Sequence, residues 1–571
     1  MPLGSLGWSL MTAMVVGGTG ESGSSAPALD DAAPVLVRRY MHWGYWYHHY
    51  RHRAGPYFKG PNVDQGFYDF LIRLPLLKSS LKPSDRPPMV IVLHARGGDF
   101  TRHERGWSDH VVLTPDDNTT GVGHSGWFGY HERAPKPPVP DTAIVPYTHR
   151  RLIHYVRFAV KTFNVDAHRI WITGGSMGGS GALLFALHHP EWVIGAAADK
   201  PPIDLRALPG LRAMAEQSLG PMEWNLKVVG TDVSAWQYTS ITWLLSRQSH
   251  GRTWIDIHHG RRDTVVPFEQ YQTSLSPPGQ SFLQRFAYGA VPGVFSWDSG
   301  THERPDPAGG WASDFRPLGT GLIRMDRPTL AFFNPSAGHF GVPDGSDHWQ
   351  AGRRPERDPR GTINGFCRWG DDLVDRPERF EVSLWLGDDR PEREQGLPDE
   401  VTYSVSPRGT HRFPIPPRCR FRYQVDPDGP RGRTNSDEYG HLVVDGVPFR
   451  RGRQKAVRLC IEHDTDLPVV AVISPTHPSV VPRAPTTAVV RWSIANGSPQ
   501  DPRPVDRYRC WISTDPNTAP PADCETPQTE RVFESLQPGR YHVRVQARLV
   551  DGRWGPTTAS VIHVDPDSPV P

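Results

Sequence analysis

Short apolar runs alternate with helical repeats over the first 305 residues or so. Met89–Leu93 and Arg169–Thr173 have the apolar character of strands that are covered on both faces. Pro146–Phe163 has apolar residues at helical spacing, and Gly181–His189 consists of apolar helix formers followed by Pro190. This alternation predicts an α/β fold, a doubly wound and mostly parallel sheet with helices on both faces. Other expected strands are Phe67–Leu74 as an edge strand, His110–Thr114, Val193–Ala198, Thr253–Ile257 and Gly293–Trp297.

Helical periodicity ends near residue 310. Short strand-like runs between turn residues then predict a β-rich accessory region over 312–468. Residues 469–571 contain strands at the spacing of a β-sandwich. We therefore expect a leader or disordered segment at 1–30 and an α/β domain at 31–311, followed by these two all-β parts. A chain of 571 residues is too long for a single core, which agrees with several domains.

Charge and hydropathy exclude two classes of partner. The chain has 63 Lys and Arg against 61 Asp and Glu, with the signs interspersed, so nucleic acid is not an expected partner. No stretch approaches the ~20 apolar residues of a transmembrane segment. Residues 1–28 carry a weak apolar run followed by small residues, which resembles a secretory signal, although the leading Lys or Arg of such a signal is absent. We therefore expect an extracellular or periplasmic protein.

All five cysteines lie from Cys367 onward, and their spacing matches no zinc site, so no metal is expected. Cys510 and Cys524 could form a disulfide in an exported protein. Because five is odd, at least one thiol is free or pairs between chains.

Tyr40–Arg53 is an unusual segment that contains two Trp, four Tyr and four His within 14 residues. One interpretation is an aromatic platform for sugar rings or a polymer chain. The other is an extended N-terminal arm that packs on the following domain.

A G-x-S-x-G pattern, Gly174–Gly178, lies between the strand at Arg169 and the helix that follows. On a strand–turn–helix this is a nucleophile elbow, a strained turn that exposes the hydroxyl of Ser176. Gly178, Gly179 and Gly181 each cost a helix about 1 kcal/mol relative to Ala. They therefore indicate a close approach of backbone there. Taken alone, the pattern could also be a Gly-rich turn without chemistry.

Acyl transfer also needs a base and an acid that orients it. Asp263 follows the strand at Thr253, and His302 follows the strand at Gly293. The carboxyl ends of parallel strands share one edge, so both should lie beside Ser176. The order Ser, Asp, His is that of α/β-hydrolases. Asp263 could instead be a turn residue, and His302 a surface histidine with His339 and His348 as its competitors.

The oxyanion of acyl transfer needs N–H donors. The amide of Met177 is the first candidate. The second is expected in the turn that ends the strand Met89–Leu93, at Ala95 or Arg96, with His94 holding the loop. The side chain of Arg96 could reach an anionic group of a substrate. Aromatic residues expected to wall an acyl or sugar site, or to pack in the core, are Trp107, Trp127, Tyr130, Trp224, Trp236 and Trp243.

Residues 66–305 resemble the α/β-hydrolase superfamily, in the esterase branch with polyhydroxybutyrate depolymerases, feruloyl esterases and prolyl-oligopeptidase-like hydrolases. The resemblance is carried by these segments: Val90–Gly98, Val165–Ile170, Gly174–Gly179, His259–Pro267 and His302. It implies a serine esterase with Ser176 as nucleophile, Asp263 as orienting acid and His302 as general base, without cofactor or metal. The family usually has Gly directly after the His of the oxyanion loop, where Ala95 stands here. A Gly often follows the catalytic His, where Glu303 stands here.

About 95 residues of the C-terminal part resemble the fibronectin type III-like domains of extracellular bacterial enzymes. The resemblance is carried by Ser474–Pro478, the strand around Trp492, Leu536–Tyr541 and Trp554–Pro556. It implies spacing, surface attachment or weak glycan contact rather than chemistry.

The expected function is hydrolysis of an extracellular ester, such as a polyester or an acyl group linked to a plant polymer or polysaccharide, through an acyl-enzyme. A peptidase or amidase would use the same triad and stays an alternative. A non-catalytic carbohydrate- or surface-binding protein on a hydrolase scaffold is a second alternative. The complete set of Ser176, Asp263 and His302 favours the enzyme.

Overall fold

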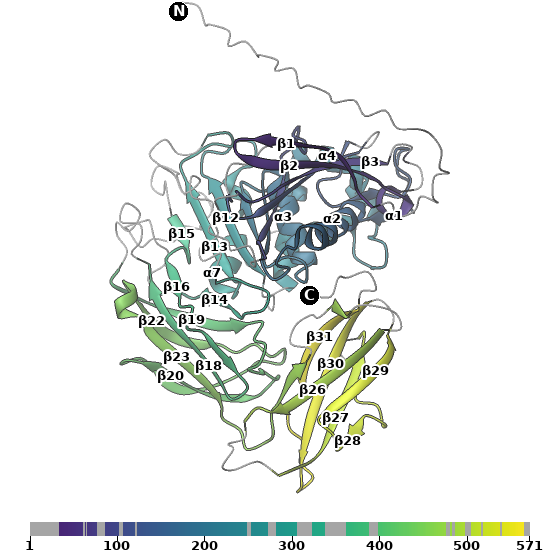
Figure 1. Ribbon diagram of the computed structural model, residues 1–571. Coiled ribbons are helices and arrows are strands. Elements are labelled where there is room, and N and C mark those ends of the chain that lie inside the picture. Colours follow the sequence, from purple (N-terminus) through teal and green to yellow (C-terminus); the bar gives the residue numbers. More distant parts are fainter. Residues whose placement is uncertain are drawn as a thin grey trace, which may run out of the picture.

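The computed structural model describes residues 33–60, 63, 66–76, 86–101, 107–119, 123–247, 253–271, 281–304, 322–336, 361–387, 398–474, 480–481, 486–496, 504–515, 518–536 and 539–564 (Figure 1). None of the helices in these ranges is long and apolar enough to cross a membrane.

A ten-stranded sheet forms the centre of the molecule, in the order β1-β2-β3-β5-β4-β10-β11-β12-β13-β15. The strands from β5 to β13 in this order are parallel, and the outer strands are antiparallel. The mostly parallel α/β sheet is thus confirmed. The bounds are β1 (Val35–His42), β2 (Tyr45–Arg53), β3 (Phe67–Arg73), β4 (Met89–Leu93), β5 (Val111–Pro115), β10 (Ile170–Gly175), β11 (Gly195–Asp199), β12 (Trp254–Gly260), β13 (Gly293–Asp298) and β15 (Gly361–Ile363).

One face of this sheet is covered by helices. These are α2 (Tyr147–Phe163), α3 (Met177–His188), α6 (Ile241–Arg247) and α7 (Phe282–Tyr288), with the single turn α1 (Pro56–Lys59) beside α2. The crossovers that contain α2, α3, α6 and α7 all advance in one direction along the sheet, so right-handed connections place them on the same face. Their apolar residues share a core with Ile91 and Ile172.

The other face of the sheet packs against the β-rich region. Val90, Val92 and Trp171 share a core with residues of that region. We expected helices on both faces. The connection from β4 to β5 reverses direction and would place a helix on this second face, but its described residues contain none. The β-rich region covers this face instead.

The N-terminal arm is a β-hairpin that extends the sheet. Its two-residue turn, Trp43–Gly44, has φ of 49° and 80°, as a type I′ turn requires. The arm pairs with β3, which therefore lies between β2 and β5. The expectation that Phe67–Leu74 is an edge strand was wrong. Tyr45 and Tyr47 are buried in the hairpin, whereas Trp43 remains exposed.

The β-rich region contains two antiparallel sheets, one of β14, β19 and β22 and one of β16, β17, β18, β20, β21 and β23. β15 belongs to the central sheet, so the boundary expected at residue 311 does not coincide with the edge of that sheet. The bounds are β14 (Thr329–Phe333), β16 (Cys367–Trp369), β17 (Val374–Arg376), β18 (Arg379–Leu386), β19 (Glu400–Arg408), β20 (Arg420–Asp426), β21 (Arg431–Asn435), β22 (Val444–Arg450) and β23 (Val457–His463).

The C-terminal part has two further sheets, which lie beside the β-rich region in Figure 1. Both contribute to one core that includes Val490, Trp492, Cys510 and Val545. Cys510 and the other four cysteines are free thiols. The bounds are β24 (Val470–Ser474), β26 (Thr486–Ile494) and β29 (Glu530–Leu536) in one sheet, and β25 (Val480–Val481), β27 (Val505–Ser513), β28 (Glu525–Thr526), β30 (Gly539–Leu549) and β31 (Thr558–Val564) in the other.

Short elements after β5 and after β11 lie at the carboxyl edge of the central sheet. They are β6 (Asn118–Thr119), β7 (Gly123–His124), β8 (Tyr130–His131), β9 (Ile144–Val145), the 3-10 turns at Leu205–Ala207 and Met222–Trp224, α4 (Pro209–Leu219) and α5 (Ala235–Tyr238). Two further 3-10 turns span Phe268–Tyr271 and Arg453–Lys455.

Candidate active site

Ser176 stands at the turn between β10 and α3. Its φ of 52° is in the left-handed region, which residues with side chains rarely adopt. Its amide donates a hydrogen bond of 2.8 Å to the carbonyl of Asp199, at the end of the neighbouring strand β11. The sequence pattern therefore forms the strained strand–turn–helix that it predicts, with Ser176 at its apex.

The glycines of α3 are required by close packing. A Cβ at Gly178 would lie 2.2 Å from the carbonyl oxygen of Leu93, at the end of β4. A Cβ at Gly181 would lie 2.3 Å from Cβ of Trp127. Both distances are far below van der Waals contact, so a larger side chain would push α3 away from β4 at Gly178 and from Trp127 at Gly181. The low helix propensity of these residues thus has the expected cause.

Asp263 and His302 meet above the ends of β12 and β13. His302 Nδ1 lies 2.7 Å from Oδ2 of Asp263. The other oxygen, Oδ1, accepts hydrogen bonds of 2.9 and 2.8 Å from the amides of Val265 and Val266. Burial of Asp263 opposes its charge, but the hydrogen bonds from His302 and Val266 outweigh burial and lower its pKa. The ionised carboxylate only accepts, so Nδ1 of His302 carries the proton, and Nε2 of the neutral ring is free to take another.

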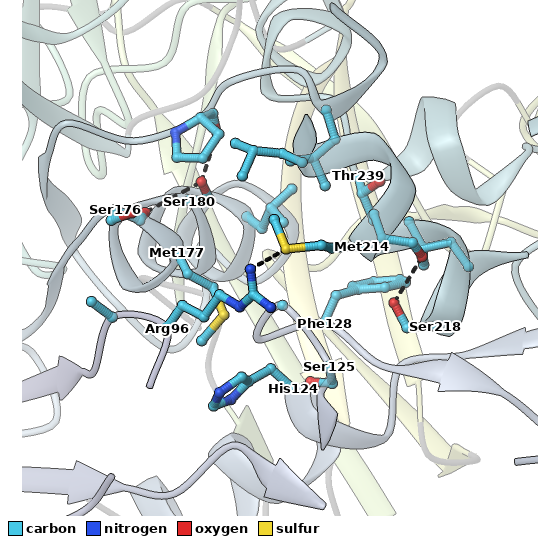
Figure 2. Close-up of a pocket in the computed structure, with 18 of the residues that line it drawn as sticks. Arg96, His124, Ser125, Phe128, Ser176, Met177, Ser180, Met214, Ser218 and Thr239 are labelled. Carbon is cyan, nitrogen blue, oxygen red and sulfur yellow. Dashed lines mark hydrogen bonds between the residues drawn. The ribbon is translucent and has the colours of Figure 1, made fainter. Parts of the chain in front are cut away.

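One cavity of about 460 Å³ brings the predicted residues together. Ser176, Met177 and His302 line it, as do Ala95 and Arg96 from the loop after β4. Figure 2 shows Arg96, Ser176 and Met177 on one side of this cavity and Ser218 on the other. The remaining lining residues are His124, Ser125, Gly126, Phe128, Ser180, Leu184, Pro202, Ile203, Leu205, Leu211, Met214, Ala215, Leu219, Thr239 and Val265.

The loop after β4 presents two amides without an acceptor. Among the described residues, none accepts a hydrogen bond from the amides of Ala95 and Arg96, nor from that of Met177 at the start of α3. The next two amides are engaged, since Gly97 donates to His124 Nε2 at 3.3 Å and Gly98 donates to the carbonyl of Ala95 at 3.0 Å. The amides of Ala95, Arg96 and Met177, which are the predicted oxyanion donors, are therefore available to donate to a bound oxyanion.

His94 supports this loop from within the protein. It is buried, does not line the cavity, and its Nε2 accepts a hydrogen bond of 3.1 Å from the amide of Asp117. Its Nδ1 donates to the carbonyl of Ala95 at 2.9 Å. Trp127 Nε1 donates to the carbonyl of His94 at 3.0 Å. These contacts agree with the expectation that His94 holds the shape of the loop.

Helix α4 forms a wall of the cavity that was not predicted from the sequence. Its lining residues are Leu211, Met214, Ala215, Ser218 and Leu219. They recur at three- and four-residue spacing, which is one face of a helix. That spacing was visible in the sequence and could have identified α4, although not what this face covers.

The tryptophans that were expected to wall an acyl or sugar site do not do so. None of Trp107, Trp127, Tyr130, Trp224, Trp236 and Trp243 lines the described cavity. Trp127, Tyr130 and Trp236 are buried in packed clusters. Phe128 is the aromatic residue that reaches the cavity. The large aromatic residues of this region contribute chiefly to the core.

A buried ionic cluster lies directly behind the elbow and was also missed. His258, at the end of β12, has Nδ1 2.9 Å from Oδ1 of Asp199 and Nε2 3.2 Å from Oδ2 of Asp298. Burial lowers the pKa of His258, but the two carboxylates outweigh it and raise the pKa above its ordinary value. The carbonyl of Asp199 holds Ser176, and Asp298 lies on the strand that leads to His302. The ring of His258 therefore links the two parts of the site.

The neighbouring His259 behaves differently, which no sequence signal could reveal. It is fully buried, and burial lowers its pKa to about 4. Its Nε2 donates to the carbonyl of Val266 at 2.7 Å, closing the turn that carries Asp263.

His339 and His348, the competitors of His302, lie outside the described residues. Within the described ranges, no group of three or more His, Cys, Asp and Glu could hold a metal ion.

Comparison with protein families identifies the segment that builds this site. Residues 112–318 match the family model Esterase, whose description reads "Putative esterase". The matched segment is therefore similar to a family of esterases. It includes Ser176, Asp263 and His302, whereas the loop with Ala95 and Arg96 precedes the matched residues.

Solved structures of hydrolases resemble part of the chain. An S-formylglutathione hydrolase from Agrobacterium tumefaciens is 16% identical, with a TM-score of 0.35, over 47% of this chain and 92% of its own. Dipeptidyl peptidase 4 from Porphyromonas gingivalis is 17% identical, with a TM-score of 0.30, over 43% and 32%. A bacterial heroin esterase is 14% identical, with a TM-score of 0.30, over 46% and 77%. Comparison with curated proteins gave no match.

Proposed function

We propose that this protein is a carboxylic ester hydrolase with Ser176, His302 and Asp263 as its catalytic triad. The observation that carries the proposal is the 2.7 Å hydrogen bond between His302 and Asp263, with His302 and the elbow serine lining one cavity. A buried carboxylate that orients an imidazole beside a strained serine is the arrangement that activates a hydroxyl for acyl transfer.

The proposed reaction has two stages. Nε2 of His302 takes the proton of Ser176 as Oγ attacks the ester carbonyl, and Asp263 stabilises the imidazolium that forms. The amide of Met177, with that of Ala95 or Arg96, donates to the oxyanion. Collapse of the tetrahedral intermediate breaks the ester bond, and His302 protonates the leaving alcohol. Water, deprotonated by His302, then attacks the acyl-enzyme and releases the acid.

Fluorophosphonate labelling tests the proposal. Wild-type protein should be labelled at Ser176, and Ser176→Ala should abolish both the label and ester hydrolysis. Ser180→Ala is a matched control, because Ser180 lines the same cavity but its hydroxyl donates to the carbonyl of Pro202 at 2.6 Å. It should still be labelled. An unlabelled wild type, or equal labelling of Ser176→Ala, would contradict the triad.

The cavity favours apolar esters as substrates. Its lining is largely apolar, with leucines, Phe128 and Met214, and it would take an apolar acyl or alcohol group. Polyesters and acyl groups linked to plant polymers or polysaccharides remain our proposed natural substrates on the sequence resemblance alone. Release of acid from polyester film or acylated xylan would test them.

We also propose an extracellular or periplasmic location, with the C-terminal sandwich as a fibronectin type III-like module that gives weak surface or glycan contact. The cysteines offer a test of the location. The amide of Cys510, on β27, donates to the carbonyl of Cys524, directly before β28, at 3.0 Å, so the two residues are neighbours. In an oxidising compartment they should resist alkylation, in protein unfolded in denaturant, until a reductant is added. Immediate alkylation of all five thiols in denaturant, in protein purified from its native compartment, would contradict export.

A further inference from the structure

Arg96 is the permanently charged side chain of the cavity. The ionisable residues in the lining are Arg96, His124 and His302, and no Asp or Glu lines it. A cavity with a guanidinium and two imidazoles but no carboxylate attracts an anion. The positive charge of this lining would not contribute to the binding of an uncharged ester.

The guanidinium of Arg96 also lacks a strong acceptor. Its one hydrogen-bond partner among the described residues is the thioether of Met214 on α4 (Figure 2). A thioether is a weak acceptor, and a guanidinium has five N–H donors. Some arginines of the matched segment do have carboxylate partners, such as Arg169 with Asp166 and Arg206 with Asp204. Arg96 therefore reaches across the cavity with most of its donors unused.

His124, which also lines the cavity, has a second N–H group without an acceptor in the described part of the chain. Its Nε2 accepts the hydrogen bond from Gly97, so in the neutral ring Nδ1 carries the proton. Nδ1 is buried and has no hydrogen-bond partner among the described residues. Burial is the main cause that lowers the pKa of His124, and the charge of Arg96 also acts in this direction. The ring is thus a neutral donor beside a cationic one.

We infer that Arg96 is a specificity-determining residue that binds a free carboxylate of the ester substrate, with the apolar part of that substrate lying along α4. The inference rests on the proposed esterase function. A monoanionic carboxylate matches one guanidinium fork with one neutral N–H, whereas a phosphate dianion would call for more positive charge. Because the amide of Arg96 is also a candidate oxyanion donor, the carboxylate lies only a short chain from the reacting carbonyl. Half-esters of dicarboxylic acids fit this description.

Methyl hydrogen adipate and dimethyl adipate test the inference, because they share the same chain and differ only at the far end, where one has a carboxylate and the other a second methyl ester. The readout is the ratio of their kcat/KM values, so that any general loss of activity cancels. Wild-type protein should favour the half-ester, and Arg96→Gln should lower the ratio by about tenfold, as expected for loss of one charge-assisted hydrogen bond. Arg96→Lys keeps the charge without the fork and should give an intermediate ratio.

Arg212→Gln is the matched control. Arg212 lies on α4, pairs with Glu216 at 3.7 Å and does not line the cavity. The ratio of the two kcat/KM values in Arg212→Gln should equal that of the wild type. An unchanged ratio in Arg96→Gln, with p-nitrophenyl acetate still hydrolysed, would overturn the inference alone. Failure to hydrolyse any of the three esters, with no fluorophosphonate label, would overturn the proposed function and the inference with it.

Discussion

His302 and Asp263 lie 39 residues apart in the chain and 2.7 Å apart in space. Each follows a parallel strand of the central sheet, and the carboxyl ends of such strands share one edge. Two amides hold the other oxygen of Asp263, so the carboxylate can turn little. The orientation of the imidazole is therefore determined by the backbone after β12.

Asp263→Asn should leave the fold intact and remove most of the activity. The amide oxygen of Asn can still accept from Val265 and Val266, but its NH₂ group would face Nδ1 and favour the wrong tautomer of His302. We expect kcat for p-nitrophenyl acetate to fall by about 10³- to 10⁴-fold. Asp166→Asn removes a carboxylate that pairs with Arg169 outside the cavity and should keep normal kcat. Near-normal turnover by Asp263→Asn would mean that another acid orients His302.

His258→Gln should reduce stability in a pH-dependent way. The pKa of His258 is raised in the folded protein, against burial, by Asp199 and Asp298. Its charge therefore contributes stability that is complete below the unfolded pKa of about 6.5 and is lost as the pH rises through the raised value. The difference in Tm between wild type and His258→Gln should be largest in acid and narrow above neutral pH. Thermal unfolding between pH 5 and 9 measures it.

His188→Gln provides a control with the opposite trend. Burial lowers the pKa of His188 to about 3, and its Nε2 donates to the carbonyl of Tyr238 at 3.0 Å. The wild type loses stability as the pH falls below about 6.5, because the unfolded chain then binds a proton that the folded chain does not. The difference in Tm between the wild type and His188→Gln should therefore become smaller in acid. Parallel pH profiles for the two variants would contradict both assignments of charge.

Gly181→Ala should destabilise the protein by about 1–3 kcal/mol, since the new methyl group would overlap Trp127 in the core. Gly210→Ala is its control, because a Cβ at this position in α4 meets nothing within 4 Å. Replacing this helical Gly should be neutral or stabilise by up to about 1 kcal/mol. Denaturant unfolding measures both. Equal effects of the two substitutions would show that the glycine run near Ser176 is not required by packing.

Local patterns predicted much of the site, because its chemistry lies where strands end. Ser176, Asp263 and His302 follow apolar runs that the sequence makes recognisable, and the rule for parallel strands brings them to one edge. The contrast between His258 and His259 was not predictable. Both occur in one strand, and only the tertiary neighbours decide that the pKa of His258 is raised and that of His259 is lowered.

The sequence also did not indicate which elements pack on each face of the central sheet. Val90 and Val92 read as buried whether helices or strands lie against them. The β-rich region takes the second face, where the described residues of the β4–β5 connection form no helix, and no local periodicity encodes this. Which aromatic residues line the cavity was not predictable for a related reason. Trp127 is buried in the core and Phe128 lines the cavity, although the two are neighbours in the chain.

Ala215→Phe should narrow the range of esters that the protein hydrolyses. Ala215 lines the cavity on α4, and a phenyl ring there would occupy space that an acyl chain needs. We expect kcat/KM for p-nitrophenyl octanoate to fall by about tenfold or more relative to the acetate, since even one misfit methylene changes selectivity by about 10- to 200-fold.

Ala213→Phe makes the same substitution two residues away on the same helix. Ala213 is exposed and does not line the cavity, so the ratio of octanoate to acetate hydrolysis should stay at the wild-type value. Helix propensity and added surface are matched between the two variants, and only the direction of the side chain differs. If both variants keep the wild-type ratio, the acyl chain does not lie along α4. If only Ala215→Phe changes it, the apolar face of α4 is where the ester binds.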